Sequence, residues 1–125
     1  MLPRILIVDD SSLVRNLLRK SLESVPGWTV CAEAVNGEEA IELAQRLHPN
    51  LIVLDLSMPV MNGLQAAKAL NKLMPAVPKI MFTSFITQHL EQEAYASGVI
   101  QVISKDDSIN SLISAVQSFA LKDVA

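Results

Sequence analysis

The sequence predicts an α/β fold: a three-layer α/β/α sandwich built on a doubly wound parallel sheet of five strands. Short apolar runs alternate with amphipathic helical patterns along the chain. The run 51–54 is apolar throughout, which is typical of a strand covered on both faces. Polar residues follow the apolar runs directly, as expected where the carboxyl ends of parallel strands share one edge.

The first half of the chain predicts two strands and two helices. An apolar run at 5–8 predicts a strand, and a helix capped by Ser11 follows it. A Pro-Gly pair ends that helix, and the bulky and β-branched residues at 28–32 predict the second strand. Asn36 then caps a second helix that begins with the acid Glu38.

The second half repeats the alternation three times. Proline and glycine mark the loops between its elements, and Gly98 is placed where a helix usually ends. The predicted elements are a strand at 51–54, a helix after Gly63, a strand at 79–83, a helix at 87–97, a strand at 99–103 and a helix at 109–119.

The composition is that of one compact domain over residues 1–125. Half of the 125 residues are hydrophobic and the mean hydropathy is +0.35, which is ample for one core. A net charge of −3 leaves no basic surface for nucleic acid. Cys31 is a single cysteine, and the run 5–8 is too short for a signal peptide or a membrane span. We therefore expect a cytoplasmic protein with no direct contact to nucleic acid or membrane.

Candidate functional residues stand where the predicted strands end. Asp9 and Asp10 follow the first strand, Asp55 the third, Thr83 ends the fourth and Lys105 follows the fifth. Ligands of open α/β sheets bind at this edge. Each residue by itself has an ordinary explanation as a cap or a strand-end charge, but the agreement of four strand ends favours a site.

The residue types suggest phosphoryl chemistry. Neighbouring carboxylates repel one another and need a cation, and oxygen ligands without His or Cys favour Mg²⁺, with Mn²⁺ as the alternative. Lys105 would neutralise an anion beside them, and Thr83 offers a hydroxyl. In such a set Asp55 could attack phosphorus in line.

These residues make the sequence resemble the receiver domain of bacterial two-component response regulators along essentially its whole length. The resemblance implies a flavodoxin-like sheet of strand order 2-1-3-4-5. It also implies transfer of phosphate to an aspartate from the phosphohistidine of a sensor kinase or a histidine phosphotransfer protein. The matching residues are Ile5-Leu6-Ile7-Val8-Asp9-Asp10-Ser11, Asp55-Leu56-Ser57-Met58-Pro59, Asn62-Gly63, Thr83-Ser84, Gly98 and Lys105.

The resemblance assigns a role to each matching position. It implies that Asp55 is the phosphoacceptor and also contacts the Mg²⁺. Asp10 would bind the ion directly and Asp9 largely through water, and the backbone carbonyl of Ser57 would complete the protein's ligands.

The resemblance also implies contacts to the phosphoryl group and to partners. Thr83 would bond a phosphoryl oxygen and shift inward, and Lys105 would pair with the phosphoryl charge. Partner kinases would dock along the first helix, near Arg15. A downstream output domain or partner protein would receive the signal, and the face of the fourth and fifth helices could form a homodimer.

The chain departs from the family pattern at three points. Val102 replaces the usual aromatic residue three positions before the lysine, and we expect Phe85 to take over its role. Ser57 and Phe85 lie where side chains control the access of water, and we predict that Phe85 lengthens the lifetime of the acyl phosphate. Asp106 replaces the usual proline, as in receivers joined to helix-turn-helix domains, so a cis peptide cannot be assumed there.

Two other classes of function share part of this pattern. A phosphatase of the haloacid-dehalogenase type also uses an aspartate nucleophile with Mg²⁺, but it needs a second acid where this chain has Ser57. A receiver-like binding module that is never phosphorylated would not need every chemical position filled. A stand-alone receiver and the amino-terminal part of a transcription regulator both remain open.

Overall fold

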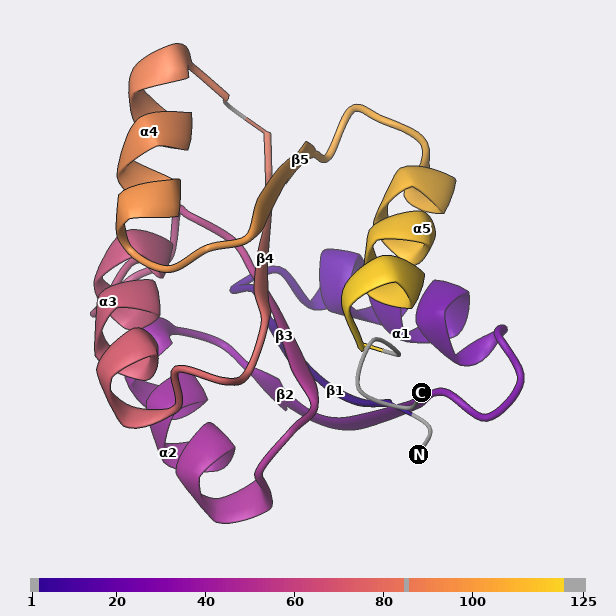
Figure 1. Cartoon of the computed structure of the whole chain (residues 1–125). Helices are drawn as coiled ribbons and strands as arrows, with labels where there is room; N and C mark the ends of the chain where they lie inside the picture. The colour runs from indigo at the N-terminus through magenta and orange to yellow at the C-terminus, as the bar shows by residue number, and fades with distance from the viewer. Residues whose placement is uncertain (1–2, 85, 121–125) are drawn as a thin grey trace.

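A computed structural model describes residues 3–84 and 86–120 and places five strands in one parallel sheet (Figure 1). The strand order is β2-β1-β3-β4-β5, and each neighbouring pair is parallel. The predicted fold class and strand order are therefore confirmed. The strands are β1 (Arg4–Val8), β2 (Thr29–Ala34), β3 (Leu51–Leu54), β4 (Lys79–Thr83) and β5 (Gln101–Ser104).

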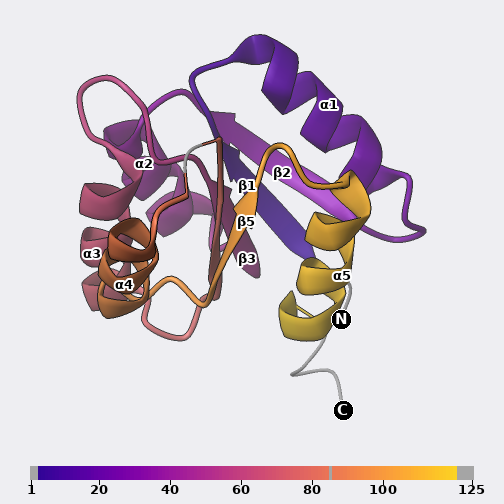
Figure 2. The ribbon, with the colours of Figure 1, turned by 90° about the horizontal axis from the view of Figure 1, so that it is seen from above.

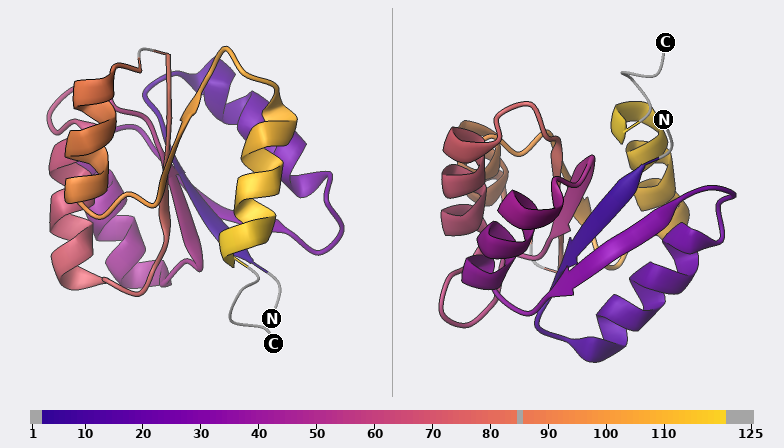
Figure 3. Two further views of the ribbon diagram at one scale, coloured as in Figure 1. Left: turned by 45° about the horizontal axis from the view of Figure 1, so that its top comes forward. Right: turned by 90° about the horizontal axis from the view of Figure 1, so that it is seen from below.

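Helices cover both faces of the sheet. Figures 2 and 3 show α1 and α5 on one side and α2, α3 and α4 on the other. Side chains along β1 point alternately to the two faces of the sheet. Ile7 packs in the core under α1 and α5, and Leu6 packs in the core under the other three helices. The helices are α1 (Ser12–Glu23), α2 (Gly37–Leu47), α3 (Gly63–Leu73), α4 (Gln88–Ala96) and α5 (Ile109–Ala120).

Four helices begin at polar caps that follow strand ends. Each cap side chain accepts a hydrogen bond from a backbone N–H in the first turn of its helix, which satisfies a donor that the helix leaves unpaired. These caps place the amino ends of the helices at the edge where the strands end. The capping residues are Ser11, Asn36, Asn62 and Thr87.

Two strands begin later than their apolar patterns predicted. Trp28 does not start β2, because its N–H donates to the carbonyl of Val25 at 3.1 Å and closes the turn after α1. Val99 precedes β5, because its N–H donates to the carbonyl of Ala94 at 3.0 Å at the end of α4. Both side chains are buried all the same. The apolar patterns therefore predict burial more sharply than they predict strand pairing.

The loop between β3 and α3 packs tightly against the end of β3. Gly63 opens α3 and donates its N–H to the carbonyl of Leu56 at 2.8 Å. A β-carbon at this position would overlap the carbonyl oxygen of Asp55, which is backbone and cannot move aside. Glycine is required here because α3 starts in contact with the chain at Asp55.

Val60, in the same loop, adopts a strained backbone. Its φ is +67°, and the N–H of Met61 donates across it to the carbonyl of Pro59 at 2.7 Å. A tight three-residue turn with positive φ is rare, and a β-branched residue pays an additional steric penalty there. The Val60 side chain is 75% exposed, so little burial offsets this strain.

We predict that Val60→Gly raises the free energy of unfolding by about 0.5–1 kcal/mol, because relief of the positive-φ strain exceeds the chain entropy that glycine adds. Urea denaturation measures the change. Val60→Ala is the control, since it trims the same exposed side chain but keeps a β-carbon. A Val60→Gly protein no more stable than Val60→Ala would contradict this account of the loop.

Candidate functional site

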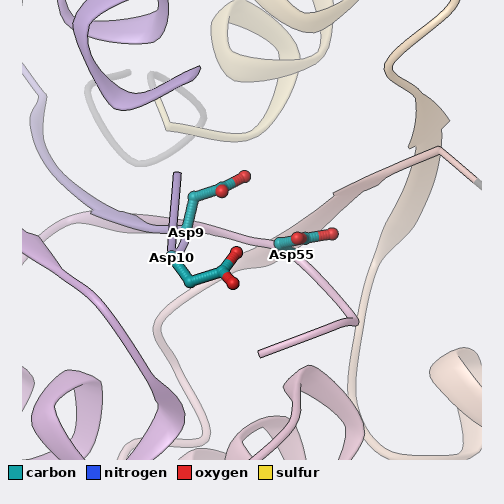
Figure 4. A group of neighbouring side chains, drawn as sticks. All are labelled: Asp9, Asp10 and Asp55. Atoms are coloured by element: carbon teal, nitrogen blue, oxygen red, sulfur yellow. The ribbon is translucent and has the colours of Figure 1, made fainter. Parts of the chain in front are cut away.

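Three carboxylates meet at the edge where the strands end. Asp9 and Asp10 follow β1, and Asp55 follows the neighbouring strand β3. One carboxylate oxygen of each lies within 4.8 Å of those of the other two, and Figure 4 shows the three side chains close to one another. Asp9 and Asp55 are buried, whereas Asp10 is exposed. The sequence-predicted grouping of these acids is confirmed.

Lys105 reaches the same cluster from the end of β5. Its Nζ lies 2.8 Å from Asp9 Oδ2 and 3.2 Å from Asp55 Oδ2. The backbone N–H of Lys105 donates to the carbonyl of Thr83 at 2.9 Å, which fixes the start of its side chain beside β4. One ammonium therefore bridges the two buried acids.

Backbone groups orient the other oxygens of the buried acids. Asp9 Oδ1 accepts a hydrogen bond from the N–H of Ser11 at 2.9 Å. Asp55 Oδ1 accepts one from the N–H of Leu56 at 2.8 Å. Each carboxylate thus has one oxygen on the backbone and the other on Lys105, so both are held in one orientation before any ligand arrives.

The electrostatics of the site favour the charged form of Lys105 and disfavour the charged form of Asp55. Burial raises the pKa of Asp55, and the nearby charge of Asp9 raises it further, although Lys105 opposes both effects. Burial would lower the pKa of Lys105, but its hydrogen bond to Asp9 and the charges of both buried acids outweigh burial and raise it. Lys105 therefore stays protonated at neutral pH, while the ionised form of Asp55 is disfavoured.

The donor set fits a hard divalent cation. All three acids offer oxygen ligands, the type that Mg²⁺ and Mn²⁺ prefer. With one ammonium against three carboxylates, negative charge remains in excess at the opening. Ser57 lies exposed in the adjoining loop. The residues present are therefore suited to hold such an ion.

The structure also places Thr83, Val102 and the peptide after Lys105. Thr83 is buried at the end of β4, between the strands that carry Asp55 and Lys105. Val102 is partly buried and packs against the core under α2, α3 and α4. The peptide between Lys105 and Asp106 is trans. Phe85 was predicted to replace the usual aromatic residue and to lengthen the lifetime of the acyl phosphate, and it lies outside the described residues.

The structure places the side chain of Arg15, a candidate for the docking surface on α1, in contact with β2 and the acidic loop. Its side chain is only 16% exposed, because Nε lies 3.0 Å from Glu33 Oε1 and one terminal nitrogen donates to the carbonyl of Asp9 at 2.7 Å. The exposed apolar residues of α1 are instead Leu13 and Leu17, at 79% and 56%. No signal in the sequence pairs Arg15 with Glu33, since the two lie 18 positions apart along the chain and only the fold brings them together.

The described residues contain no helix with the length and apolar character needed to cross a bilayer.

Comparison with known proteins identifies relatives of the whole fold. A family model described as the response regulator receiver domain matches residues 5–117. Protein-glutamate methylesterase/protein-glutamine glutaminase 1 of Methanosarcina acetivorans is 41% identical over 107 residues, which cover 84% of this chain and 30% of that protein. This chain therefore spans less than a third of the length of that relative.

Two solved structures have the same fold. The response regulator domain of Thermotoga maritima CheB has a TM-score of 0.89 at 30% identity, covering 96% of this chain and 97% of that one. A two-component response regulator of the LuxR family from Aurantimonas has a TM-score of 0.92 at 28% identity, covering 96% of this chain and 86% of that one.

We predict that Asp55→Asn raises the free energy of unfolding at neutral pH by about 0.5–2 kcal/mol, the range common for stabilising substitutions, because the ionised acid is disfavoured where it is buried beside Asp9. The raised pKa means that the folded state binds the Asp55 proton more tightly than the unfolded state. Stability is therefore lost as the pH rises from the ordinary value of 3.8 through the raised pKa of folded Asp55, and the loss is complete above it. Below the ordinary value of 3.8, both states are protonated and the gain should shrink.

Urea denaturation in chelator-treated buffer, at neutral and at acidic pH, measures this difference. Asp106→Asn is the control, because it removes an exposed acid close to the site. An Asp55→Asn protein less stable than wild type at neutral pH would contradict the prediction.

Proposed function

The chain belongs to the response regulator receiver domain family, and we propose that its switch is the transfer of a phosphoryl group from a phosphohistidine to Asp55. The donor would be a sensor histidine kinase or a histidine phosphotransfer protein. One observation carries the proposal: Asp55 lies at the strand edge with two further acids and an ammonium that contacts it at 3.2 Å.

In the proposed transfer, a carboxylate oxygen of Asp55 attacks phosphorus. The new O–P bond forms as the P–N bond to the histidine breaks, and the electron pair of that bond stays on the imidazole nitrogen. The transfer brings two anions together, so a charge that lowers their repulsion speeds it. Lys105 is already in contact with Asp55, and its ammonium can turn to an oxygen of the incoming phosphoryl group.

Asp9, Asp10, Asp55 and the carbonyl of Ser57 would hold Mg²⁺ or Mn²⁺. When bound, the ion supplies the positive charge that the excess of carboxylates lacks, and it neutralises phosphoryl oxygens. Asp9 is fixed by Ser11 and Lys105, which suits an acid that acts through water. The exposed Asp10 suits direct ligation.

Thr83 would communicate the new charge to the rest of the domain. Its position supports this role, because Thr83 is buried at the end of β4, the strand between β3 and β5. A hydrogen bond from this hydroxyl to a phosphoryl oxygen would draw the end of β4 inward. The product of the reaction is thus an altered surface of the domain itself, and we propose no other substrate.

Partners would use two surfaces. The exposed Leu13 and Leu17 on α1 offer an apolar contact for the donor beside the site. On the output side, similarity to regulators of the LuxR family supports a role as the receiver part of a longer, cytoplasmic regulator, with residues 1–125 as one receiver domain. A homodimer through α4 and α5 would be one form of output.

The two alternative functions, a phosphatase and an unphosphorylated binding module, differ in the support they receive. The phosphatase of the haloacid-dehalogenase type receives no support from the family match. A receiver-like module that binds partners without being phosphorylated differs from the proposal in one measurable respect, the reactivity of Asp55.

We predict that incubation with acetyl phosphate and Mg²⁺ adds one phosphoryl group to the wild-type chain and none to Asp55→Asn. Intact-mass spectrometry measures the additions. Asp106→Asn, which removes an exposed acid outside the cluster, should be modified like wild type. Equal labelling of wild type and Asp55→Asn would refute Asp55 as the acceptor, and an unmodified wild type would favour the binding module.

A further inference from the structure

Both peptide groups that flank Asp9 are held by hydrogen bonds that involve β2. The N–H of Asp9 donates to the carbonyl of Ala34 at 3.0 Å. On the other side, the Asp9 carbonyl accepts a hydrogen bond of 2.7 Å from the guanidinium of Arg15. Arg15 itself is tied to β2, because its Nε donates to Glu33 Oε1 at 3.0 Å. The last two residues of β2 therefore anchor the acidic loop, one directly and one through Arg15.

The contact between Arg15 and Glu33 is a shielded ion pair. The two side chains are 16% and 25% exposed. Burial alone would raise the pKa of Glu33, but the hydrogen bonds and charges of Arg19 and Arg15 outweigh burial and lower it. Glu33 is therefore ionised at neutral pH. A guanidinium presents its donors in a rigid plane, so Arg15 can hold the carboxylate and the Asp9 carbonyl at one fixed angle.

The carbonyl that Arg15 holds belongs to the peptide joining Asp9 to Asp10. A peptide group is planar, so fixing its oxygen restricts the rotation of the backbone on both sides. A rotation of this peptide group would turn the Asp9 carboxylate away from Lys105 and the Asp10 carboxylate away from the other two acids. The contact from Arg15 thus bears on the direction of both acids, although it touches neither carboxylate.

We propose that Arg15 is a positioning residue for the metal site: held by Glu33, it orients the Asp9–Asp10 peptide and so sets the affinity of the acid cluster for a divalent cation. The inference rests on the proposed function only in taking the cluster to be a metal site. Neighbours that orient metal ligands commonly change metal affinity by about 10–100-fold when they are replaced.

Arg19 provides a matched control within the same ion-pair network. It lies one turn further along α1 and donates to the other oxygen of Glu33 at 2.8 Å. It also lies 3.7 Å from Glu23. Its own backbone contact is to the carbonyl of Val30 at 3.5 Å, away from the acidic loop. If Arg15 served only to join α1 to β2, replacing Arg19 would have the same consequences.

Two substitutions of Arg15 separate positioning from charge. Removing a positive charge near the cluster would, by itself, strengthen the binding of a cation. Arg15→Lys keeps the charge but loses the planar fork that reaches two acceptors at once. Arg15→Met removes both. Loss of positioning weakens cation binding in both variants, whereas an effect of charge alone strengthens it in Arg15→Met and leaves Arg15→Lys unchanged.

The experiment measures Mn²⁺ binding to the full chain by electron paramagnetic resonance of the free ion, with Mg²⁺ as competitor and no phosphoryl donor present. We expect the Kd of Arg15→Lys and Arg15→Met to rise by about tenfold, the lower end of the range for neighbours that orient metal ligands. The Kd of Arg19→Lys should stay within about twofold of wild type. Thermal unfolding of the same samples shows that each variant is folded at the temperature of the titration.

Three results would overturn the proposal: a Kd of Arg15→Lys within twofold of wild type, an equal rise in Arg19→Lys, or tighter binding by Arg15→Met. If Arg15→Met does not fold, Arg15→Lys and Glu33→Gln decide, and Glu33→Gln must also weaken binding. A wild-type chain that binds no Mn²⁺ would instead remove the metal site from the proposed function, and this inference with it. Normal binding in the Arg15 variants would remove the inference alone.

Discussion

The contact of one ammonium with two buried carboxylates is the interaction on which the rest of the site depends. Lys105 Nζ lies within 3.2 Å of both Asp9 and Asp55, and these three residues follow three different strands. Burying two acids side by side would be prohibitive without a partner charge. The parallel sheet makes the contact geometrically available, because it brings the carboxyl ends of β1, β3 and β5 to one edge.

A second buried lysine shows that the raised pKa of Lys105 comes from its carboxylate neighbours and not from burial. Lys79 starts β4, at the opposite end from the cluster, and is 1% exposed. Its Nζ donates to the carbonyl of Met74 at 3.1 Å, beyond the end of α3. Burial lowers the pKa of Lys79, whereas the acids raise the pKa of Lys105. Lys79 is thus a structural cation at a helix end, whereas the charge of Lys105 is stabilised by the two carboxylates that it contacts.

The fold and the acid cluster could be predicted because both follow from local patterns. Apolar runs such as 51–54 mark buried strands, and Asp9, Asp55 and Lys105 are informative because each follows such a run. The orientation of Arg15 could not be predicted, since its partner Glu33 becomes a neighbour only when α1 packs beside β2. The positive φ of Val60 likewise arises from closing a loop whose ends are held by tertiary contacts, and valine gives no sign of it.

We propose that this charge arrangement makes Asp55, and no other acid of the cluster, the acceptor of a phosphoryl group. The most direct measurement is borohydride reduction of the chain after incubation with acetyl phosphate, followed by peptide sequencing by mass spectrometry. Reduction converts an aspartyl phosphate to homoserine. The account predicts homoserine at position 55 alone, and homoserine at position 9 or 10 in place of position 55 would contradict it.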